Sequence, residues 1–172
     1  MYGFGGDGDD VFDTDRDLDT ASMAYGQLYG GAGNDKMNLI ETTMKMYGSG
    51  DDGDDKITYF ATMGTTVVTG DDGSDIIYGR DGYGMGIPKI YGDWNQSDII
   101  LDPELAGIGG DDKIYGGNGE PDAPKVGTFQ YSGGAGSDLI SIGSDLLGPV
   151  YVTGDNYALP MGIRTEDATA LN

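Results

Sequence analysis

The hexapeptide GGAGND, Gly30 to Asp35, has close copies throughout the 172-residue chain. Each copy follows one pattern: a glycine, two variable residues, a second glycine, one variable residue and an aspartate. Such a repeat predicts a solenoid or array in which every copy forms the same local structure. The full copies span Gly5–Asp10 (GGDGDD), Gly30–Asp35, Gly50–Asp55 (GDDGDD), Gly70–Asp75 (GDDGSD), Gly107–Asp112 (GIGGDD) and Gly133–Asp138 (GGAGSD). Weaker copies are Gly92–Asp98, which has one extra residue, and the truncated Gly154–Asn156.

An apolar residue follows the aspartate of each hexapeptide at a fixed distance. The runs around it, such as KMNLI and KITYF, are short and rich in β-branched and aromatic residues, which is typical of strands with one buried face. Similar runs, such as QLY and TVVT, precede most hexapeptides. The repeating unit is therefore predicted to be a strand, a Gly/Asp turn, a second strand and a return loop. The apolar residues are Phe12, Met37, Ile57, Ile77, Ile100, Ile114 and Ile140.

The aspartates that end the hexapeptides are unevenly spaced. The intervals along the series Asp10, Asp35, Asp55, Asp75, Asp98, Asp112 and Asp138 are 25, 20, 20, 23, 14 and 26 residues. The segments that return to the next unit, such as ATMGT and GRDGYGMGIP, share no pattern. We therefore expect the turns to stack along one edge of the solenoid and irregular loops to form the other. The 14-residue step requires an unusually tight return.

The repeat resembles the repeats-in-toxin (hemolysin-type) calcium-binding nonapeptide GGxGxDxUx, where U is a large apolar residue. Three copies match at every defined position, GGDGDDVFD, GGAGNDKMN and GGAGSDLIS, and three more lack only the second glycine. The match covers Gly5 to Ser141. The resemblance implies an all-β, right-handed parallel β-roll or β-solenoid of about seven coils over residues 1–157. Residues 158–172 are not repeat-like and are expected to form a cap or a tail that contacts another subunit.

The residue types in the hexapeptide suit calcium. Calcium takes six to eight oxygen ligands at about 2.3–2.6 Å, and a tight turn supplies them from backbone carbonyls and one carboxylate. Glycine at the first and fourth positions permits a positive φ and leaves room for carbonyls to point inward. Stacked coils also bring equivalent aspartates to about 4.8 Å, where they repel unless a cation lies between them.

The resemblance implies that each ion lies between two successive turns and contacts the aspartates of both. We expect about five or six calcium ions. The predicted carboxylate ligands are Asp10, Asp35, Asp55, Asp75, Asp98, Asp112 and Asp138. The predicted carbonyl ligands lie near Gly5, Asp7, Asp9, Gly30, Ala32, Asn34, Gly50, Asp52, Asp54, Gly70, Asp72, Ser74, Gly107, Gly109, Asp111, Gly133, Ala135 and Ser137. Asp9, Asp52, Asp54, Asp72 and Asp111 either add side-chain ligands or simply face water.

Composition excludes several classes of function. The net charge of −21 opposes binding to nucleic acid or to an anionic membrane surface. The chain has no Cys and no His, so it lacks the preferred ligands of zinc and copper and the usual nucleophile and base of an enzyme. We therefore expect no catalytic activity. Six divalent ions would add 12 charges and change −21 to −9, a value tolerable for a soluble domain.

Two functional hypotheses remain. The first is a calcium-stabilised structural protein at the cell surface or outside the cell, which associates head to tail into a filament or surface layer. The second is a calcium-dependent spacer, adhesion or carbohydrate-binding module of a larger secreted adhesin, toxin or polysaccharide-modifying enzyme. Extracellular calcium modules bind at about 10⁻⁴–10⁻³ M, which suits both. A weaker alternative is ice binding through threonines, although these do not recur in every unit.

Simpler structural explanations exist for the turns and for the tyrosines. A single Gly/Asp hexapeptide is most often an ordinary hairpin turn, whereas six in register favour metal binding. The tyrosines that flank the turns are expected to pack as a ladder, with a sugar-binding platform as the alternative. They are Tyr29, Tyr47, Tyr59, Tyr78, Tyr91, Tyr115, Tyr131 and Tyr151.

Overall fold

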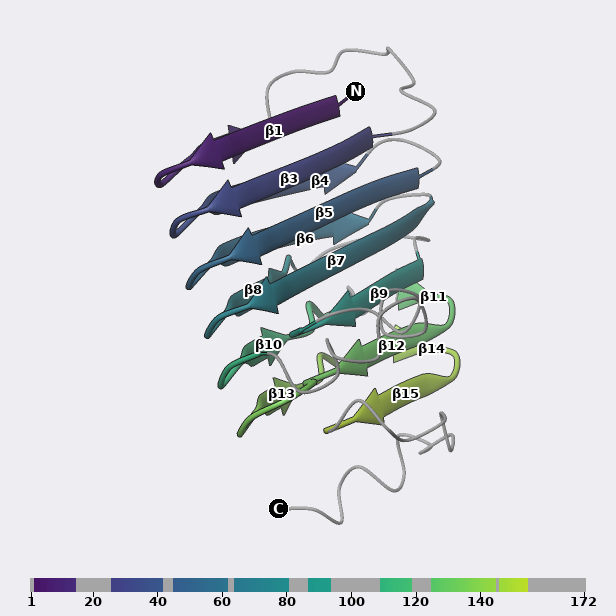
Figure 1. Ribbon diagram of the computed structural model, residues 1–172. Coiled ribbons are helices and arrows are strands. Elements are labelled where there is room, and N and C mark those ends of the chain that lie inside the picture. The colour runs from purple at the N-terminus through teal and green to yellow at the C-terminus, as the bar shows by residue number, and fades with distance from the viewer. Residues whose placement is uncertain are drawn as a thin grey trace, which may run out of the picture.

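The structure is a computed structural model, and it describes residues 2–14, 26–41, 45–61, 64–80, 87–93, 109–118, 125–144 and 146–154. In these segments the chain forms a β-solenoid of parallel strands without a helix (Figure 1). No helix that could cross a membrane is found in this part of the chain. Asp98, Gly107 and the predicted tail 158–172 lie outside the described residues.

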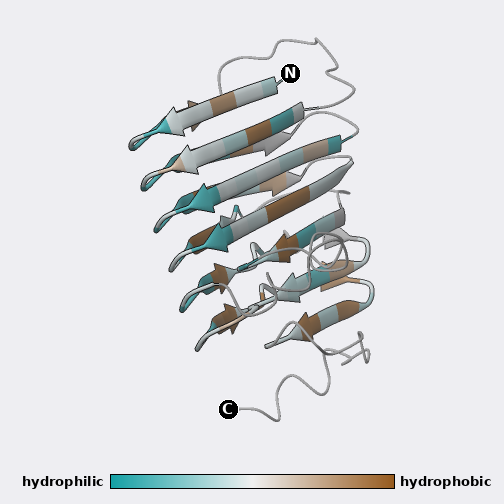
Figure 2. Ribbon diagram, viewed as in Figure 1, coloured by the Kyte–Doolittle hydropathy of each residue, from teal (hydrophilic) through white to brown (hydrophobic). Residues whose placement is uncertain are grey.

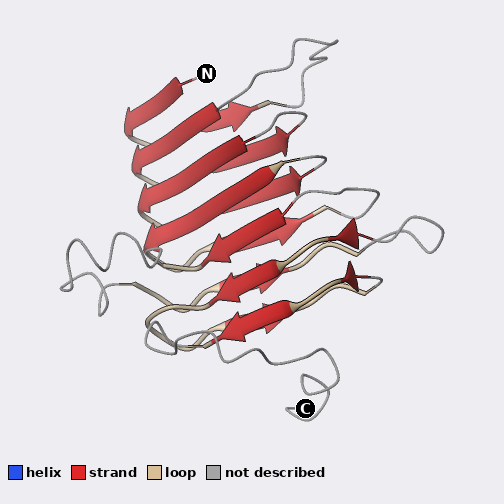
Figure 3. Cartoon of the chain, turned by 90° about the vertical axis from the view of Figure 1, so that its right-hand side faces the viewer, coloured by secondary structure: helices blue, strands red, loops and turns tan. Residues whose placement is uncertain are grey.

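Two parallel sheets face each other, and a coil contributes one strand to each of them (Figure 3). The first sheet has seven strands in the order β1 (Tyr2–Asp7), β3 (Gly26–Ala32), β5 (Lys45–Asp52), β7 (Thr65–Asp72), β9 (Ile87–Tyr91), β12 (Phe129–Ser132) and β15 (Val150–Thr153). The second has six strands in the order β2 (Val11–Asp13), β4 (Lys36–Glu41), β6 (Lys56–Ala61), β8 (Ile76–Gly79), β10 (Lys113–Tyr115) and β13 (Leu139–Ser141). A small third sheet pairs β11 (Lys125–Val126) with β14 (Leu146–Leu147).

The core lies between the two large sheets and follows the alternation of the strands. The apolar residue two places after each aspartate points inward: Met37, Ile57, Ile77 and Ile114 are 0–1% exposed. The facing sheet contributes Leu28, Val68, Ile90, Phe129 and Val150, and Figure 2 shows this apolar interior as brown bands on the strands. Burial of each such side chain stabilises the fold by about 1.5–3 kcal/mol.

Parallel pairing in register stacks equivalent residues directly on one another. Met37 lies beside Ile57, Ile57 beside Ile77, and Ile114 beside Ile140. One rung of the solenoid is therefore one copy of the strand–turn–strand unit, as the repeat predicts. This stacking places the Gly/Asp turns of the described segments along one edge of the solenoid.

The tyrosines do not form one ladder. Tyr59 and Tyr131 lie in the core. Tyr29 and Tyr47 lie on the outward face of the first sheet, with ring centroids 5.6 Å apart. On the outward face of the second sheet, Tyr78 and Tyr115 stack at 4.9 Å. The predicted ladder thus divides among three places, and no continuous aromatic platform results from these six rings.

The coil after Asp75 differs from the predicted spacing. β8 pairs directly with β10, and the amide of Asp75 donates to Asp112 Oδ1, 37 residues away. The predicted steps of 23 and 14 residues are therefore one step of 37 within one coil. The separate turns predicted at Asp98 and Asp112 are wrong as successive rungs.

The turn of this coil is split. Gly92 occupies the first position, because a Cβ there would overlap with Asp112 Oδ2, as a Cβ on Gly70 would with Asp75 Oδ2. Gly110 lies against Gly73 and occupies the fourth position. The described part of the turn is therefore residues 92–93 and 109–112. Residues 94–108 lie between these two parts in the sequence and outside the described segments, and Gly92, not Gly107, is the first glycine of the turn. Spacing alone did not reveal this, because GIGGDD also fits the hexapeptide pattern.

This arrangement predicts that residues 94–108 are dispensable for folding. Their deletion joins Asp93 to Gly109 and creates the uninterrupted hexapeptide GDGGDD. We expect the deletion variant to keep the circular dichroism spectrum and the Tm of the parent within about 4 °C, a change of about 1 kcal/mol for a chain of this size.

The matched control is Gly92→Val in the same turn. Its side chain would overlap with the carbonyl oxygen of Gly133 and with Asp112 Oδ2, so it should lower Tm strongly. A deletion variant as unstable as Gly92→Val would contradict the assignment of 94–108 as an insertion.

Candidate metal centre

The predicted aspartates of the described turns form one ladder inside the turn edge. Each amide donates to the carboxylate of the next coil, and Asp35, Asp55, Asp75 and Asp112 are 0–2% exposed. The N–Oδ1 distances are 2.6 Å (Asp10 to Asp35), 2.7 Å (Asp35 to Asp55), 2.7 Å (Asp55 to Asp75), 2.8 Å (Asp75 to Asp112) and 3.1 Å (Asp112 to Asp138). The structure thus brings together six of the seven predicted aspartates, and Asp98 lies outside the described residues.

The second carboxylate oxygen of each inner aspartate is unsatisfied. Oδ2 of Asp35, Asp55, Asp75 and Asp112 is buried and has no hydrogen-bond partner. A buried polar atom without a partner is costly, and a buried charge more so. The same atom recurs without a partner in four successive coils, which points to a shared ligand and not to a local packing error.

Backbone carbonyls approach these unsatisfied oxygens. A Cβ on Gly30 would overlap with both Asp35 Oδ2 and the carbonyl oxygen of Gly50 in the next coil. Gly50 and Gly70 have the same surroundings one and two coils on. Glycine at the first position is therefore required by this close approach. In each of these coils, the aspartate Oδ2 and the carbonyl oxygen of the next coil's first glycine both lie within 2.5 Å of the position that a Cβ would occupy.

These donors fit a hard cation. In the described segments no three Asp or Glu side chains come together around one point. A cation would therefore take one or two carboxylate oxygens and complete its shell with carbonyls, which calcium accepts. Among the predicted carbonyl ligands, those of Ala32, Asp52 and Asp72 each accept a hydrogen bond from a glycine amide of the preceding coil. One lone pair of each remains for a metal.

Burial changes the acidity of the inner aspartates. Desolvation raises the pKa of Asp55 to about 7, of Asp75 to about 8 and of Asp112 to about 9, and it also raises that of Asp35. The amide hydrogen bonds oppose this effect, and neighbouring carboxylates add to it. At neutral pH the carboxylates of Asp75 and Asp112 therefore hold a proton unless a cation compensates their charge.

The fifth position of the turn forms a second ladder, which the sequence did not reveal. Its side-chain oxygen accepts a hydrogen bond from the fifth-position amide of the next coil. This explains why Asp, Asn and Ser interchange there, since each is a short acceptor. Asp9, Asp54 and Asp111, predicted as extra ligands or water-facing groups, thus have a structural role. The distances are 2.9 Å (Asn34 to Asp9), 2.9 Å (Asp54 to Asn34), 2.9 Å (Ser74 to Asp54), 3.1 Å (Asp111 to Ser74) and 2.8 Å (Ser137 to Asp111).

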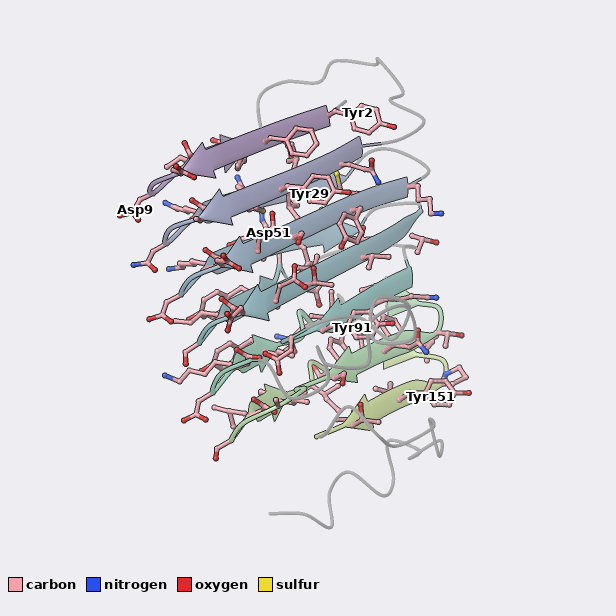
Figure 4. All side chains as sticks on the ribbon, viewed as in Figure 1. Tyr2, Asp9, Tyr29, Asp51, Tyr91 and Tyr151 are labelled. Carbon is pink, nitrogen blue, oxygen red and sulfur yellow. The ribbon has the colours of Figure 1, made fainter. Side chains whose placement is uncertain are left out.

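The second position of the turn requires a positive φ. Gly31 has a φ of 106°, and the turns without this glycine place Asp51 and Asp71 there, at 71° and 76°. Aspartate tolerates this region better than most residues. Ser49 Oγ lies within hydrogen-bonding distance of Asp51 Oδ1, at 2.6 Å, and of Asp71 Oδ2, and its single proton can serve one of them at a time. Figure 4 shows Asp51 near the turn end of β5.

Asp93 has a related role in the split turn. It is fully buried and accepts hydrogen bonds from the amides of Gly110, at 3.3 Å, and of Ala135 in the next coil. Its carboxylate thus connects the two halves of the turn across the insertion. Sequence analysis missed Asp51, Asp71 and Asp93, although an aspartate in place of the second glycine is a readable signal.

Comparison of the chain with protein-family models, with curated proteins and with solved structures gave no match. The geometry of the turns therefore carries the functional conclusion.

The raised pKa values predict a pH dependence for the metal-free protein. An unfolded aspartate has a pKa near 3.9, so between about pH 4 and pH 9 the folded chain binds more protons than the unfolded chain. The protonated aspartates contribute their full stabilisation below the pKa of the unfolded chain. That contribution is lost as the pH rises through the pKa values of the folded chain. The free energy of unfolding should fall by up to about 1.4 kcal/mol per pH unit for each titrating group.

Thermal unfolding of the metal-free protein from about pH 5 to pH 9 tests this expectation. Saturating calcium should weaken or reverse the fall, because the cation binds the deprotonated form. Asp75→Asn should reduce the slope, whereas Asp52→Asn, at an exposed site, should not. A Tm of the metal-free parent that is constant over this range would contradict the buried ladder.

Proposed function

We propose that the chain is a calcium-binding, calcium-stabilised structural protein that works outside the cell. The observation that supports this most directly is the row of buried Oδ2 atoms of Asp35, Asp55, Asp75 and Asp112, none of which has a hydrogen-bond partner. Each of the four lies in a coil where glycine carbonyls also converge. A cation in each gap satisfies both kinds of oxygen.

Calcium binding would also supply folding free energy. Without cations, the in-register ladder places buried carboxylates on successive coils, and the chain carries a net charge of −21. A ligand that binds only the folded state stabilises it by about 2.7 kcal/mol per site at a hundred times its Kd. Extracellular calcium concentrations therefore strongly favour the folded state, whereas at cytosolic concentrations and neutral pH the folded state is much less stable.

Asp55→Asn tests the ladder with little change in shape. The asparagine keeps an oxygen that accepts the amide of Asp35, but it removes the charge from two neighbouring gaps. Calorimetry should show a loss of about two bound ions relative to the parent, since a neutral amide is a poor substitute for a carboxylate ligand. Circular dichroism should show that more calcium is needed for folding.

Asp52→Asn is the matched control, because Asp52 lies in the same turn with an exposed side chain. It should bind calcium as the parent does. Magnesium should not replace calcium, because it requires octahedral geometry and retains its waters. A parent chain that is folded in EGTA and takes up no calcium would overturn the proposal.

End-to-end association is the second part of the proposal. The outer strands at one end, β1 and β2, expose Tyr2 (66%), Phe4 (71%) and Val11 (72%), and β13 at the other end exposes Leu139 (51%). Edge strands are commonly protected by Lys or Pro, and none of these strands, nor β15, contains either. Figure 4 shows Tyr2 and Tyr151 on the outermost strands of the first sheet.

Pairing of β15 with β1 of another copy would continue the parallel register. The rows that begin at Tyr2 and Phe4 end at Tyr151 and Thr153, so these residues would become neighbours. Such a contact joins two different surfaces and does not close, and it therefore builds a filament. In the alternative, further coils of a larger secreted protein cover the same edges.

Phe4→Lys tests this contact by placing a charge on β1, the outermost strand of the first sheet. In millimolar calcium we expect the parent to form long particles in sedimentation velocity and negative-stain images, and Phe4→Lys to remain monomeric. Tyr47→Lys, on the same sheet but two strands from the edge, should assemble like the parent. A monomeric parent would favour the module of a larger protein, and assembly of Phe4→Lys would exclude this edge.

A further inference from the structure

Two rows of side chains flank the turns, and all of these side chains are exposed except that of Ile76, which is half-buried. The calcium site uses only backbone carbonyls of these residues and not their side chains. The lysine row is the outward position just after each aspartate of the ladder and contains Lys36, Lys56, Ile76 and Lys113 on successive strands of the second sheet. The acid row is the third position of the turn and contains Asp7, Ala32, Asp52 and Asp72 on successive strands of the first sheet.

Neither row is required by the turn itself. Alanine stands at the third position in Ala32 and Ala135, and the lysine position is apolar in the first and last coils, at Val11 and Leu139. The inner aspartates face the gaps between the coils, and the fifth-position acids accept amide hydrogen bonds. The acid row remains exposed to solvent on the outside of the turns.

The lysine row lies in basic surroundings that are unusual for this chain. With Arg80, it brings four of the nine Lys and Arg residues to one outward face. Lys56 Nζ lies 5.5 Å above the Tyr78 ring, and the Arg80 guanidinium lies 5.9 Å from that of Phe60. This face therefore suits an acidic partner, and it is basic although the chain as a whole has a net charge of −21.

The two rows have the same order when one is read backwards. Along the coils, the lysine row reads Lys, Lys, Ile, Lys from Lys36 to Lys113. The acid row, read from Asp72 back to Asp7, gives Asp, Asp, Ala, Asp. Both rows have the strand spacing of a parallel sheet, about 4.8 Å, so they match over all four rungs.

We propose that a second copy of this chain, with its axis antiparallel, docks its acid row on the lysine row. The contact pairs Lys36 with Asp72, Lys56 with Asp52, Ile76 with Ala32, and Lys113 with Asp7 of the neighbouring copy. The two rows lie on opposite sides of the turns, so the contact is heterologous and extends sideways. This surface goes beyond the calcium site and the end-to-end contact.

Charge reversal of each row tests the pairing. Lys36→Glu/Lys56→Glu and Asp52→Lys/Asp72→Lys should each weaken lateral association by at least about tenfold, since two attractive pairs become repulsive. A mixture of the two variants should restore association, because the reversed rows complement each other. Lys45→Glu/Lys89→Glu, with the same charge change on the first sheet, is the matched control and should associate like the parent.

All of these variants are made in the full chain carrying Phe4→Lys, which is designed to remove the end-to-end contact. The measurements are made in calcium at low and at high NaCl. Sedimentation velocity measures association, and circular dichroism of the same samples reports calcium-dependent folding separately. Lateral association should decrease at high salt, because exposed charge pairs are screened. Failure to fold with calcium would thus be distinguished from failure to associate.

The relative direction of the two solenoid axes is tested by single cysteine substitutions. Each introduced cysteine is unique, because the chain has none. Lys113→Cys and Asp7→Cys chains should form a mixed disulfide, whereas Lys36→Cys and Asp7→Cys chains, which a parallel arrangement shifted by one rung would pair, should not. A mixture of charge-reversed variants that stays dissociated would overturn the proposal. It would also be overturned by a folded monomer whose lysine row binds a soluble polyanion such as dextran sulfate, which would assign this face to an anionic polymer.

Discussion

Stacking of like charges is the constraint on which this fold depends. A parallel sheet in register repeats every position at the strand spacing, so one aspartate per coil becomes a continuous row of carboxylates. In this chain the row is buried from Asp35 to Asp112. The amide of each preceding coil stabilises one oxygen, and the other oxygen needs a counterion. The same periodicity that builds the core thus makes the turn edge dependent on solution conditions.

Each position of the hexapeptide solves a different part of this problem. The first glycine lets a carbonyl approach the carboxylate, and the second position takes a positive φ, through Gly31 in one turn and Asp71 in another. The fifth position ties neighbouring coils through a side-chain acceptor, as in Asn34 and Asp54. Its amides donate toward the preceding coil, whereas those of the sixth position donate toward the following one. Adjacent turns are therefore held in both directions.

Much of this could be predicted from the sequence because the repeat is strict where it faces inward. The parallel solenoid, the apolar anchors such as Met37 and Ile57, and the neighbours of Asp35 follow from register alone. The split turn could not be predicted, because Gly107–Asp112 satisfies the pattern while its true first glycine is Gly92. The fifth-position ladder was missed for another reason. A side chain that accepts an amide from the next coil gives no signal within its own hexapeptide.

The insertion shows that the solenoid separates its length from the size of its chain. Asp35 and Asp55 are 20 residues apart and Asp75 and Asp112 are 37 apart, yet each pair occupies adjacent rungs. Height along the axis is set by the hydrogen-bonded strand spacing, so a coil with more residues still occupies one rung. The length of the solenoid therefore depends on the number of coils and not on the number of residues. Residues can therefore be inserted or replaced at the edge of a coil during evolution without a change in the length of the solenoid.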